Sequence, residues 1–268
     1  MWMPMRALEF LVVALAPMLL AGCLQRALLY FPADNLPTPV EIGATDYDVV
    51  RLTTADGLSL TAWHATAEEG RPTIVYLQGN AGNIAGRVPK LRPFREAGYG
   101  VLLVGYRGYG GNPGTPSEAG LLADGVAGLA YLADVGVSPD RVVLFGESLG
   151  SAVAIRLAAS HRVAALILEA PFTSIIDAGR YHYPLLPVET LAEDRFDSIR
   201  HIAGVTAPVL IVHGARDRIV PVAQGRRLLA AAPEPKRGVF LPRASHNNLA
   251  AFGAADIQLA FLAEFVGP

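Results

Sequence analysis

The sequence feature that most constrains this chain is a serine between two glycines, at the junction of a strand-like run and a helix-like run. The five residues are Gly146, Glu147, Ser148, Leu149 and Gly150. They follow the aliphatic and aromatic residues 142–145 and precede the alanine-rich residues 152–159. A G-x-S-x-G pattern in this setting is typical of a nucleophile elbow, where the serine is held on a strained strand-to-helix turn. The chain has 27 glycines in 268 residues, so an exposed serine in a glycine-rich turn is the alternative interpretation.

Strand-like and helix-like segments alternate along the rest of the chain. Residues 47–52 and 58–63 flank the turn residues Asp56 and Gly57 and predict a β-hairpin. Continuous apolar runs predict buried strands at 73–77, 101–104, 142–145, 164–168, 209–212 and 238–241. Helical patterns cover residues 86–97, 117–134, 222–232 and 248–265, with short helical pieces over 173–203. This order predicts an α/β fold, with a mostly parallel sheet covered by helices on both faces and an antiparallel N-terminal edge.

Polar residues follow directly after the apolar strands, and the carboxyl ends of the strands in such a sheet collect the functional groups. A serine nucleophile needs a base in contact with it and a carboxylate that orients the base, in the chain order Ser, acid, His. Of six histidines, only His246 follows every strand-end carboxylate downstream of Ser148, so it is the candidate base. His161 ends the elbow helix, one layer away from the strand tips, and His182 and His201 are assigned to packing or solvent contact. His213 is assigned to a backbone-bonded turn, with a catalytic role as the alternative.

Two carboxylates at strand ends can supply the orienting acid. Asp217 lies in the loop after the strand at residues 209–212, from which it can reach the loop of His246. Glu169 ends the strand at 164–168 and is the rival. A turn aspartate paired with a neighbouring arginine would explain Asp217 as well, but not its agreement in order with the serine and the histidine. Asp217 is therefore the predicted acid.

A tetrahedral oxyanion needs preorganised N–H donors, each worth about 3 kcal/mol. One donor is the backbone N–H of Leu149, the residue after the serine. The other should come from the loop after the strand at 73–77, where Gly79 permits a close approach to the elbow. We assign it to the backbone N–H of Asn80; the alternative is an ordinary glycine-asparagine turn.

The N-terminus predicts export and attachment to a membrane. Arg6 precedes a short, interrupted apolar run at residues 7–20 that ends in Leu20, Ala21, Gly22 and Cys23. Such a segment is typical of a signal peptide, and it is too short for a comfortable membrane span. The four last residues resemble the lipobox of bacterial lipoproteins, which implies cleavage before Cys23 and acylation of its thiol. An uncleaved anchor is the alternative, and either one places the domain in the cell envelope, outside the cytoplasm.

These features divide the chain into three parts. Residues 1–22 are the predicted lipoprotein signal peptide, residues 23–45 the lipidated N-terminus and a proline-containing tether, and residues 46–268 one domain. Cys23 is the only cysteine, so the domain has no internal disulfide. The formal net charge of −2 gives no basic excess, so we expect no nucleic-acid partner.

From residue 46 onwards the sequence resembles the α/β-hydrolase superfamily, and within it the Bem46-like serine hydrolases. The motifs that carry this resemblance are residues 78–83, 106–110, 146–150, 169–174, 213–217 and 245–247. The resemblance implies Ser148 as nucleophile, His246 as base and Asp217 as acid, with Asn80 and Leu149 as oxyanion donors. Two residues depart from the family pattern: Gln78 stands in place of histidine, and Gly105 in place of an acid or asparagine.

The sequence thus predicts a membrane-tethered serine hydrolase that cleaves a carboxylic ester or thioester in a small-molecule or acyl substrate. No metal or organic cofactor is implied. Amide hydrolysis and a non-catalytic binding scaffold are the alternatives. About 35 residues separate Pro171 from the next long strand, too few for a large lid, so an open site is expected. Its apolar roof is assigned to Tyr181, Tyr183, Leu185 and Leu186.

Overall fold

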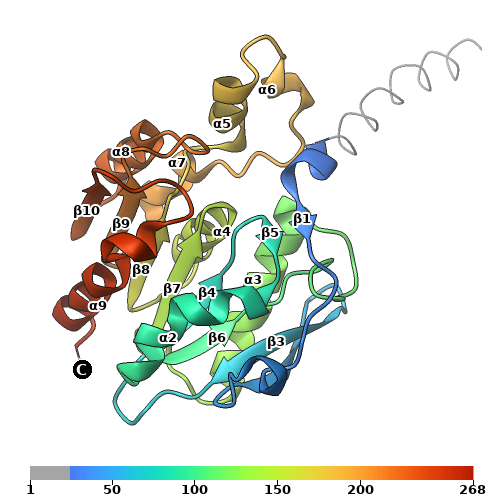
Figure 1. Ribbon diagram of the computed structural model, residues 1–268, viewed down its shortest axis with the longest axis vertical. Helices are drawn as coiled ribbons and strands as arrows, with labels where there is room; N and C mark the ends of the chain where they lie inside the picture. The colour runs from blue at the N-terminus through green and yellow to red at the C-terminus, as the bar shows by residue number, and fades with distance from the viewer. Residues whose placement is uncertain (1–24, 268) are drawn as a thin grey trace, which may run out of the picture.

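The computed structural model describes residues 25–267, and a sheet of eight strands forms the centre of this region (Figure 1). The strand order is β10-β9-β8-β7-β4-β6-β3-β2. The strands are β2 (Asp48–Thr53), β3 (Ser59–Ala65), β4 (Thr73–Leu77), β6 (Gly100–Leu103), β7 (Val142–Glu147), β8 (Ala165–Glu169), β9 (Val209–Gly214) and β10 (Lys236–Leu241). β6, β4, β7, β8, β9 and β10 run parallel, whereas β2 pairs antiparallel with β3 and β3 antiparallel with β6. The predicted mostly parallel sheet with an antiparallel N-terminal hairpin is confirmed.

The central strands are apolar throughout because both of their faces are covered. Successive residues of a strand point to opposite faces, and in β4 this sends Val75 and Leu77 into one hydrophobic cluster and Ile74 and Tyr76 into another. The first cluster includes side chains of α3 (Glu118–Asp134), α4 (Leu149–Ala158) and α8 (Val222–Ala231). The second includes α2 (Val88–Glu96) and α9 (Ala254–Phe265). The sheet therefore has a separate hydrophobic core on each face.

Two of the predicted helices are interrupted at their N-terminal ends. The helix expected over residues 86–97 is a 3-10 turn, η2 (Ile84–Arg87), followed by α2. The helix expected over 248–265 is η5 (Leu249–Phe252) followed by α9. Gly253 stands between these two at φ 81°, a left-handed conformation that glycine adopts without strain. The breaks do not move the elements that carry the candidate site.

The N-terminal segment is folded against the domain, which differs from the free tether expected for residues 23–45. Residues 25–29 are helical, and β1 (Phe31–Pro32) pairs in parallel with β5 (Ala81–Gly82). Tyr30 is buried and donates its hydroxyl to Asp194 over 2.8 Å. The contacts are made with residues far along the chain, so local sequence pattern gives no sign of them. The predicted signal peptide and Cys23 lie outside the described residues.

Between β8 and β9 the chain forms the short helices α5 (Ile175–His182), α6 (Val188–Leu191) and α7 (Ser198–His201). α5 and α6 stand above the carboxyl edge of the sheet (Figure 1), whereas α7 packs against α4 and α8. α5 and α6 are the small lid that the short spacing predicts. Within residues 25–267, no helix is long and apolar enough to cross a membrane.

Candidate active site

Ser148 occupies the turn between the end of β7 and the start of α4, as the sequence predicts. Its backbone lies at φ 50° and ψ −114°, a conformation that costs a non-glycine residue energy and persists only where the surroundings impose it. The backbone N–H of Ser148 donates to the carbonyl of Glu169 in the neighbouring strand over 2.9 Å, and its own carbonyl accepts a bond from the N–H of Ser151 over 2.9 Å. These two bonds fix the turn on both sides of the serine.

The glycines of the elbow are required by close backbone contacts. A Cβ atom on Gly150 would lie 2.0 Å from the carbonyl oxygen of Leu77, and one on Gly146 would lie 2.5 Å from the carbonyl oxygen of Gly150. Real Cβ atoms do not approach backbone this closely. The helix can therefore cross the strands at this distance only with glycine at both positions.

Ser148, His246 and Asp217 form a continuous hydrogen-bonded chain. His246, in the loop after β10, places its Nε2 3.0 Å from the Ser148 Oγ. Its Nδ1 lies 2.7 Å from Oδ2 of Asp217, in the loop between β9 and α8. A carboxylate only accepts, so Nδ1 carries the hydrogen of this bond and Nε2 is left to accept the serine proton. The three residues are brought together from three separate strand ends.

Asp217 is held by its backbone neighbours and by a second histidine. Its Oδ1 accepts bonds from the N–H groups of Ile219 and Val220, each over 2.8 Å. The Nε2 of buried His213 lies 3.2 Å from Oδ2 and 2.9 Å from the carbonyl of Val220. Burial acts to raise the pKa of Asp217, but the hydrogen bonds from His213 and His246 outweigh it and hold the pKa well below the ordinary value. His213 bonds to backbone in this turn, as predicted, and it also contacts the carboxylate.

The two N–H groups assigned to the oxyanion lie beside the serine. Leu149 follows it directly as the first residue of α4, and a Cβ on Gly79, the residue before Asn80, would lie 3.6 Å from the Ser148 Cβ. Neither backbone N–H donates to an acceptor within residues 25–267. The Asn80 side chain donates to the Leu29 carbonyl over 2.7 Å, and the Asn80 carbonyl accepts from the Tyr109 hydroxyl. Both contacts hold the loop of Asn80 in place.

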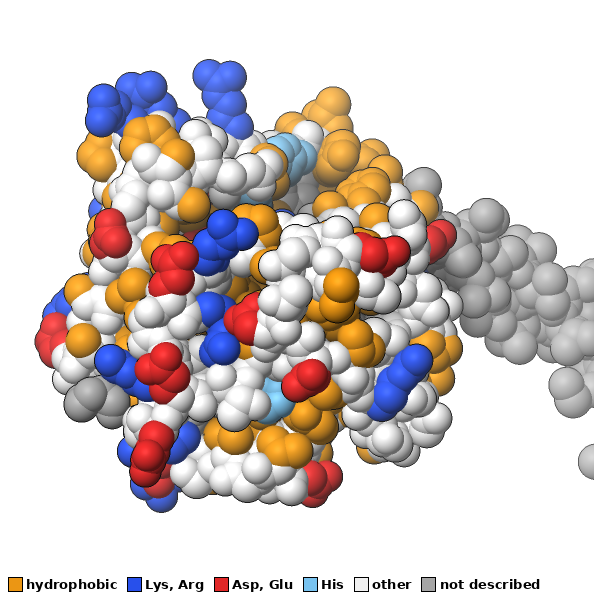
Figure 2. Space-filling view, turned by 60° about the horizontal axis from the view of Figure 1, so that its bottom comes forward, with side chains coloured by type: hydrophobic (Ala, Val, Ile, Leu, Met, Phe, Trp, Pro, Cys, Tyr) orange, Lys and Arg blue, Asp and Glu red, His pale blue; other side chains and the backbone are white. Residues whose placement is uncertain are grey.

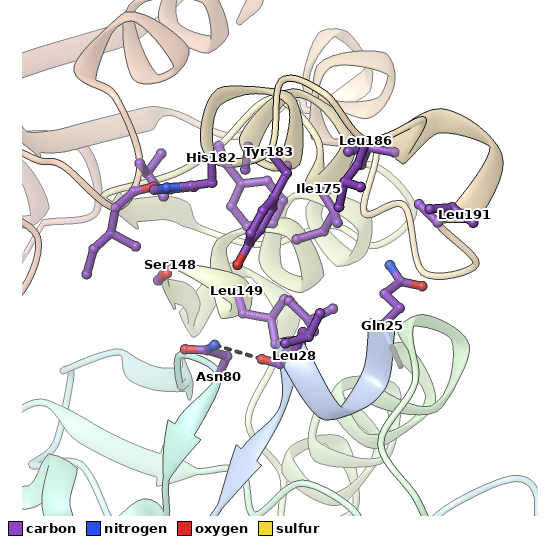
Figure 3. A pocket seen from close by; sticks show the side chains of 18 residues that line it. Gln25, Leu28, Asn80, Ser148, Leu149, Ile175, His182, Tyr183, Leu186 and Leu191 are labelled. Carbon is purple, nitrogen blue, oxygen red and sulfur yellow. Dashed lines mark hydrogen bonds between the residues drawn. The ribbon is translucent and has the colours of Figure 1, made fainter. Parts of the chain in front are cut away.

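A cavity of about 420 Å³ opens directly above Ser148 (Figure 3). Leu149, Phe172, Ile175 and Val188 are among the apolar side chains that line it. Figure 3 shows Tyr183 projecting into the cavity from the lid, with Leu28 on the opposite wall. The polar groups that line it are few, so the cavity suits a hydrocarbon group attached to a polar reacting centre.

Comparison with known proteins identifies the family. The prolyl oligopeptidase family matches residues 90–243. Protein Bem46 of Schizosaccharomyces pombe is 36% identical over 260 residues, which cover 90% of this chain and 86% of Bem46. The chain is a Bem46-like α/β-hydrolase. An uncharacterized protein of Mycobacterium tuberculosis is 43% identical over 248 residues, 88% of each chain.

Solved structures agree with this assignment at the level of the fold. The Pyrococcus furiosus esterase Pf2001 has a TM-score of 0.74 and 19% sequence identity, and the match covers 89% of the Bem46-like chain and 100% of the esterase. At this identity the likeness shows a shared fold alone. The fold predicted from the sequence motifs is thus confirmed for the Bem46-like hydrolase.

The rival carboxylate, Glu169, is engaged elsewhere in the Bem46-like hydrolase. Its Oε2 accepts a bond from Lys90 Nζ over 2.6 Å and its Oε1 a bond from Gln258 Nε2 over 2.6 Å. Lys90 also pairs with Glu147 at 2.9 Å. Burial acts to lower the pKa of Lys90, but the charges of Glu169 and Glu147 outweigh it and raise that pKa. Glu169 therefore neutralises a mostly buried lysine and makes no bond to His246.

The two departures from the family pattern have different surroundings. A Cβ on Gly105 would lie 1.9 Å from the carbonyl oxygen of Thr61, so the packing against β3 leaves room for glycine alone. Gln78 is fully buried, and neither atom of its side-chain amide has a hydrogen-bond partner within residues 25–267. Gly105 is explained by packing; nothing in the structure explains Gln78.

Only some of the predicted roof residues line the cavity in the structure, and residues that were not predicted line it as well. Tyr183 and Leu186 line the cavity, whereas Tyr181 and Leu185 do not. Gln25, Leu28 and Leu29 of the N-terminal segment also line it. Sequence reasoning missed these three because it treated their segment as a tether. Within residues 25–267, no cluster of three histidine, cysteine, aspartate or glutamate side chains could hold a metal ion.

We expect Gly150→Ala to lower the free energy of unfolding by about 3 kcal/mol or more, because the new methyl group must displace the backbone of Leu77. Denaturant titration followed by circular dichroism measures this loss. Gly86→Ala is the matched control, since a Cβ there meets nothing within 4 Å; we expect it to change stability by less than about 0.5 kcal/mol. Equal stabilities of the two variants would contradict the packing argument.

Proposed function

We propose that this Bem46-like hydrolase is a serine esterase or thioesterase that works through an acyl-enzyme intermediate. The observation that carries the proposal is the hydrogen-bonded chain from Ser148 through His246 to Asp217, with Ser148 in the lining of an apolar cavity. Each member of the chain has the partner that its role requires. The cavity supplies a place for the apolar part of an acyl substrate.

The reaction begins when the Ser148 Oγ attacks the substrate carbonyl and its proton passes to Nε2 of His246. The imidazolium that forms keeps its Nδ1–H bond to Asp217, whose negative charge stabilises it. The N–H groups of Asn80 and Leu149 bind the tetrahedral oxyanion, each contributing about 3 kcal/mol. His246 then gives the proton to the departing alkoxide or thiolate, and the alcohol or thiol leaves.

The second half of the reaction repeats these steps with water. His246 takes a proton from a water molecule, the hydroxide adds to the acyl-Ser148 carbonyl, and the same N–H groups bind the new oxyanion. When the intermediate collapses, His246 returns its proton to the Ser148 oxygen and the carboxylic acid is released. The enzyme ends in its starting protonation state, ready for the next substrate.

A fluorophosphonate probe tests the proposal on the purified full chain. Such probes react with an activated serine, so we expect covalent labelling of the native protein and none after heat denaturation. A panel of esters, thioesters and amides of increasing acyl length should show hydrolysis of the first two classes. An unlabelled native protein with no activity on the panel would refute the enzyme and favour a non-catalytic scaffold; cleavage of amides alone would assign it to the amidases.

The proposed enzyme is attached to a membrane of the cell envelope through acylated Cys23. The support is the sequence of residues 20–23 and the apolar run before it. Metabolic labelling with a palmitate analogue should mark the wild-type protein. Cys23→Ala should abolish the label and leave a larger, uncleaved precursor. Unchanged processing and labelling of this variant would contradict lipidation at Cys23.

A further inference from the structure

Exposed apolar side chains surround the mouth of the cavity, and we call this set the pocket rim. Large apolar residues that both line the cavity and are exposed are Leu28, Tyr183, Leu186, Leu191 and Ile219. Tyr181 and Leu185, in and just after α5, belong to the rim as exposed neighbours, and Leu185 is 95% exposed. Figure 2 shows hydrophobic side chains gathered at the upper right edge of the molecule. An exposed apolar patch beside a ligand cavity is typical of an interaction surface.

The rim is continuous with the inside of the cavity. Tyr183 and Leu186 belong to both, and Ile175 and Leu149 continue the apolar lining toward Ser148 (Figure 3). A hydrocarbon chain could thus pass from the rim to the serine along apolar surface. A ligand that entered from water would have to cross exposed leucines first, so the arrangement fits an apolar phase outside the mouth.

Contacts of the N-terminal segment hold the start of the described chain beside the pocket rim. Gln25 accepts bonds from the N–H groups of Glu193 and Asp194 over 2.8 and 3.0 Å, and it donates to the Asp194 carbonyl over 2.7 Å. Gln25 also lines the cavity. Cys23 is two residues away in sequence, which spans at most about 7 Å of extended chain. An acyl group on Cys23 would therefore enter its membrane close to the mouth of the cavity.

The charges around the rim suit the surface of a bilayer. The carboxylates of Glu189 and Asp177 in the lid are paired with Arg180 and Arg227 at 2.5 and 3.0 Å. Arg218, next to Ile219 of the rim, is exposed and pairs with no carboxylate within residues 25–267. The rim thus presents apolar side chains and a cation without a carboxylate partner among the described residues, which matches acyl chains beneath phosphate headgroups.

We propose that the pocket rim docks into the surface of a lipid bilayer and that the cavity receives the acyl chain of a lipid ester from that bilayer. The docking rests on the proposed lipidation of Cys23, and the substrate class rests on the proposed esterase reaction. Docking places the reacting carbonyl near Ser148 without taking the hydrocarbon through water. The substrate class is a long-chain ester held in the membrane.

The docking is tested with a fluorescent dye whose emission shifts to the blue in an apolar environment. The dye is attached to Leu185→Cys or to Val40→Cys in the full chain, reconstituted into phosphatidylcholine vesicles that contain phosphatidylglycerol. Val40 is 72% exposed, in η1 (Val40–Ile42), and lies outside the rim. Wild-type protein treated with the same dye gives the background from any Cys23 thiol that is not acylated.

We expect a blue shift at position 185, quenched by lipids that carry a quencher in their acyl chains, and neither effect at position 40. No shift at 185, or equal shifts at both positions, would overturn the docking. Quenching that depends on the density of labelled protein, and not on the lipid quencher, would indicate that the rim contacts a second copy of the chain. This result would also overturn the docking. The readout involves no hydrolysis, so its result does not depend on whether the proposed reaction takes place.

The substrate class is tested by kinetics with the double variant Tyr181→Ser, Leu185→Asp, because neither residue lines the cavity. We expect it to lose about tenfold or more in rate on a long-chain ester embedded in the same vesicles. Its rate on a soluble acetate ester should stay within about twofold of wild type. Val40→Asp should change neither rate. An unchanged rate on the vesicle ester, or equal losses on both esters, would overturn the proposal.

Discussion

Replacing Ser148 by alanine is expected to lower kcat for ester hydrolysis by about 10⁴-fold or more and to abolish labelling by fluorophosphonates. The change removes the only atom that forms the acyl-enzyme, while Asn80, Leu149 and the cavity remain. Binding and oxyanion stabilisation alone leave a small residual rate over water. Hydrolysis rates on the best ester of the panel give kcat, and the probe assay on the same preparations gives the extent of labelling.

The control for this variant is Ser160→Ala. Ser160 is exposed just after α4, so the same chemical change is made away from the site. Alanine keeps a Cβ at position 148, so Ser148→Ala should keep the strained turn and unfold at the same temperature as wild type, within a few degrees. Full labelling of Ser148→Ala, or loss of labelling in Ser160→Ala, would place the nucleophile elsewhere.

The sequence predicts those site residues whose positions are determined by the ends of strands. Ser148, Asp217 and His246 each follow an apolar run, and parallel strands bring their carboxyl ends to one edge of the sheet. The buried runs also predict the sheet itself, because a strand covered on both faces must be apolar at every position. Chain order then reduces the histidines to one. The structure places these three side chains in one hydrogen-bonded chain; their catalytic roles stay a prediction.

Contacts between distant segments could not be predicted in the same way. Gln25 bonds to the backbone at residues 193 and 194, and no periodicity or motif in either segment indicates that they meet. Leu28 and Leu29 reach the cavity for the same reason. The rival acid Glu169 is also at a strand end, and only the placement of Lys90 and Gln258 shows what binds it.

The second large effect is expected at Asp217, which the sequence favours over Glu169 as the acid. Asp217→Asn is expected to lower kcat by about 10⁴-fold, because an amide at this position can donate to Nδ1 and favours the tautomer with its hydrogen on Nε2. That tautomer cannot accept the serine proton. The neutral amide also gives no charge to stabilise the imidazolium. Burst kinetics with a chromogenic ester measure the acylation step directly.

Glu169→Gln is the matched variant, since it too exchanges a strand-end carboxylate for its amide. It removes a charge from beside Lys90, which keeps Glu147 as a partner at 2.9 Å. We expect it to lower the free energy of unfolding by about 1–3 kcal/mol and to change kcat by less than about threefold. Stability and rate thus separate the two residues: Asp217 acts on the histidine, whereas Glu169 acts on the fold. A large loss of kcat in Glu169→Gln, with a near-normal rate in Asp217→Asn, would reverse the assignment.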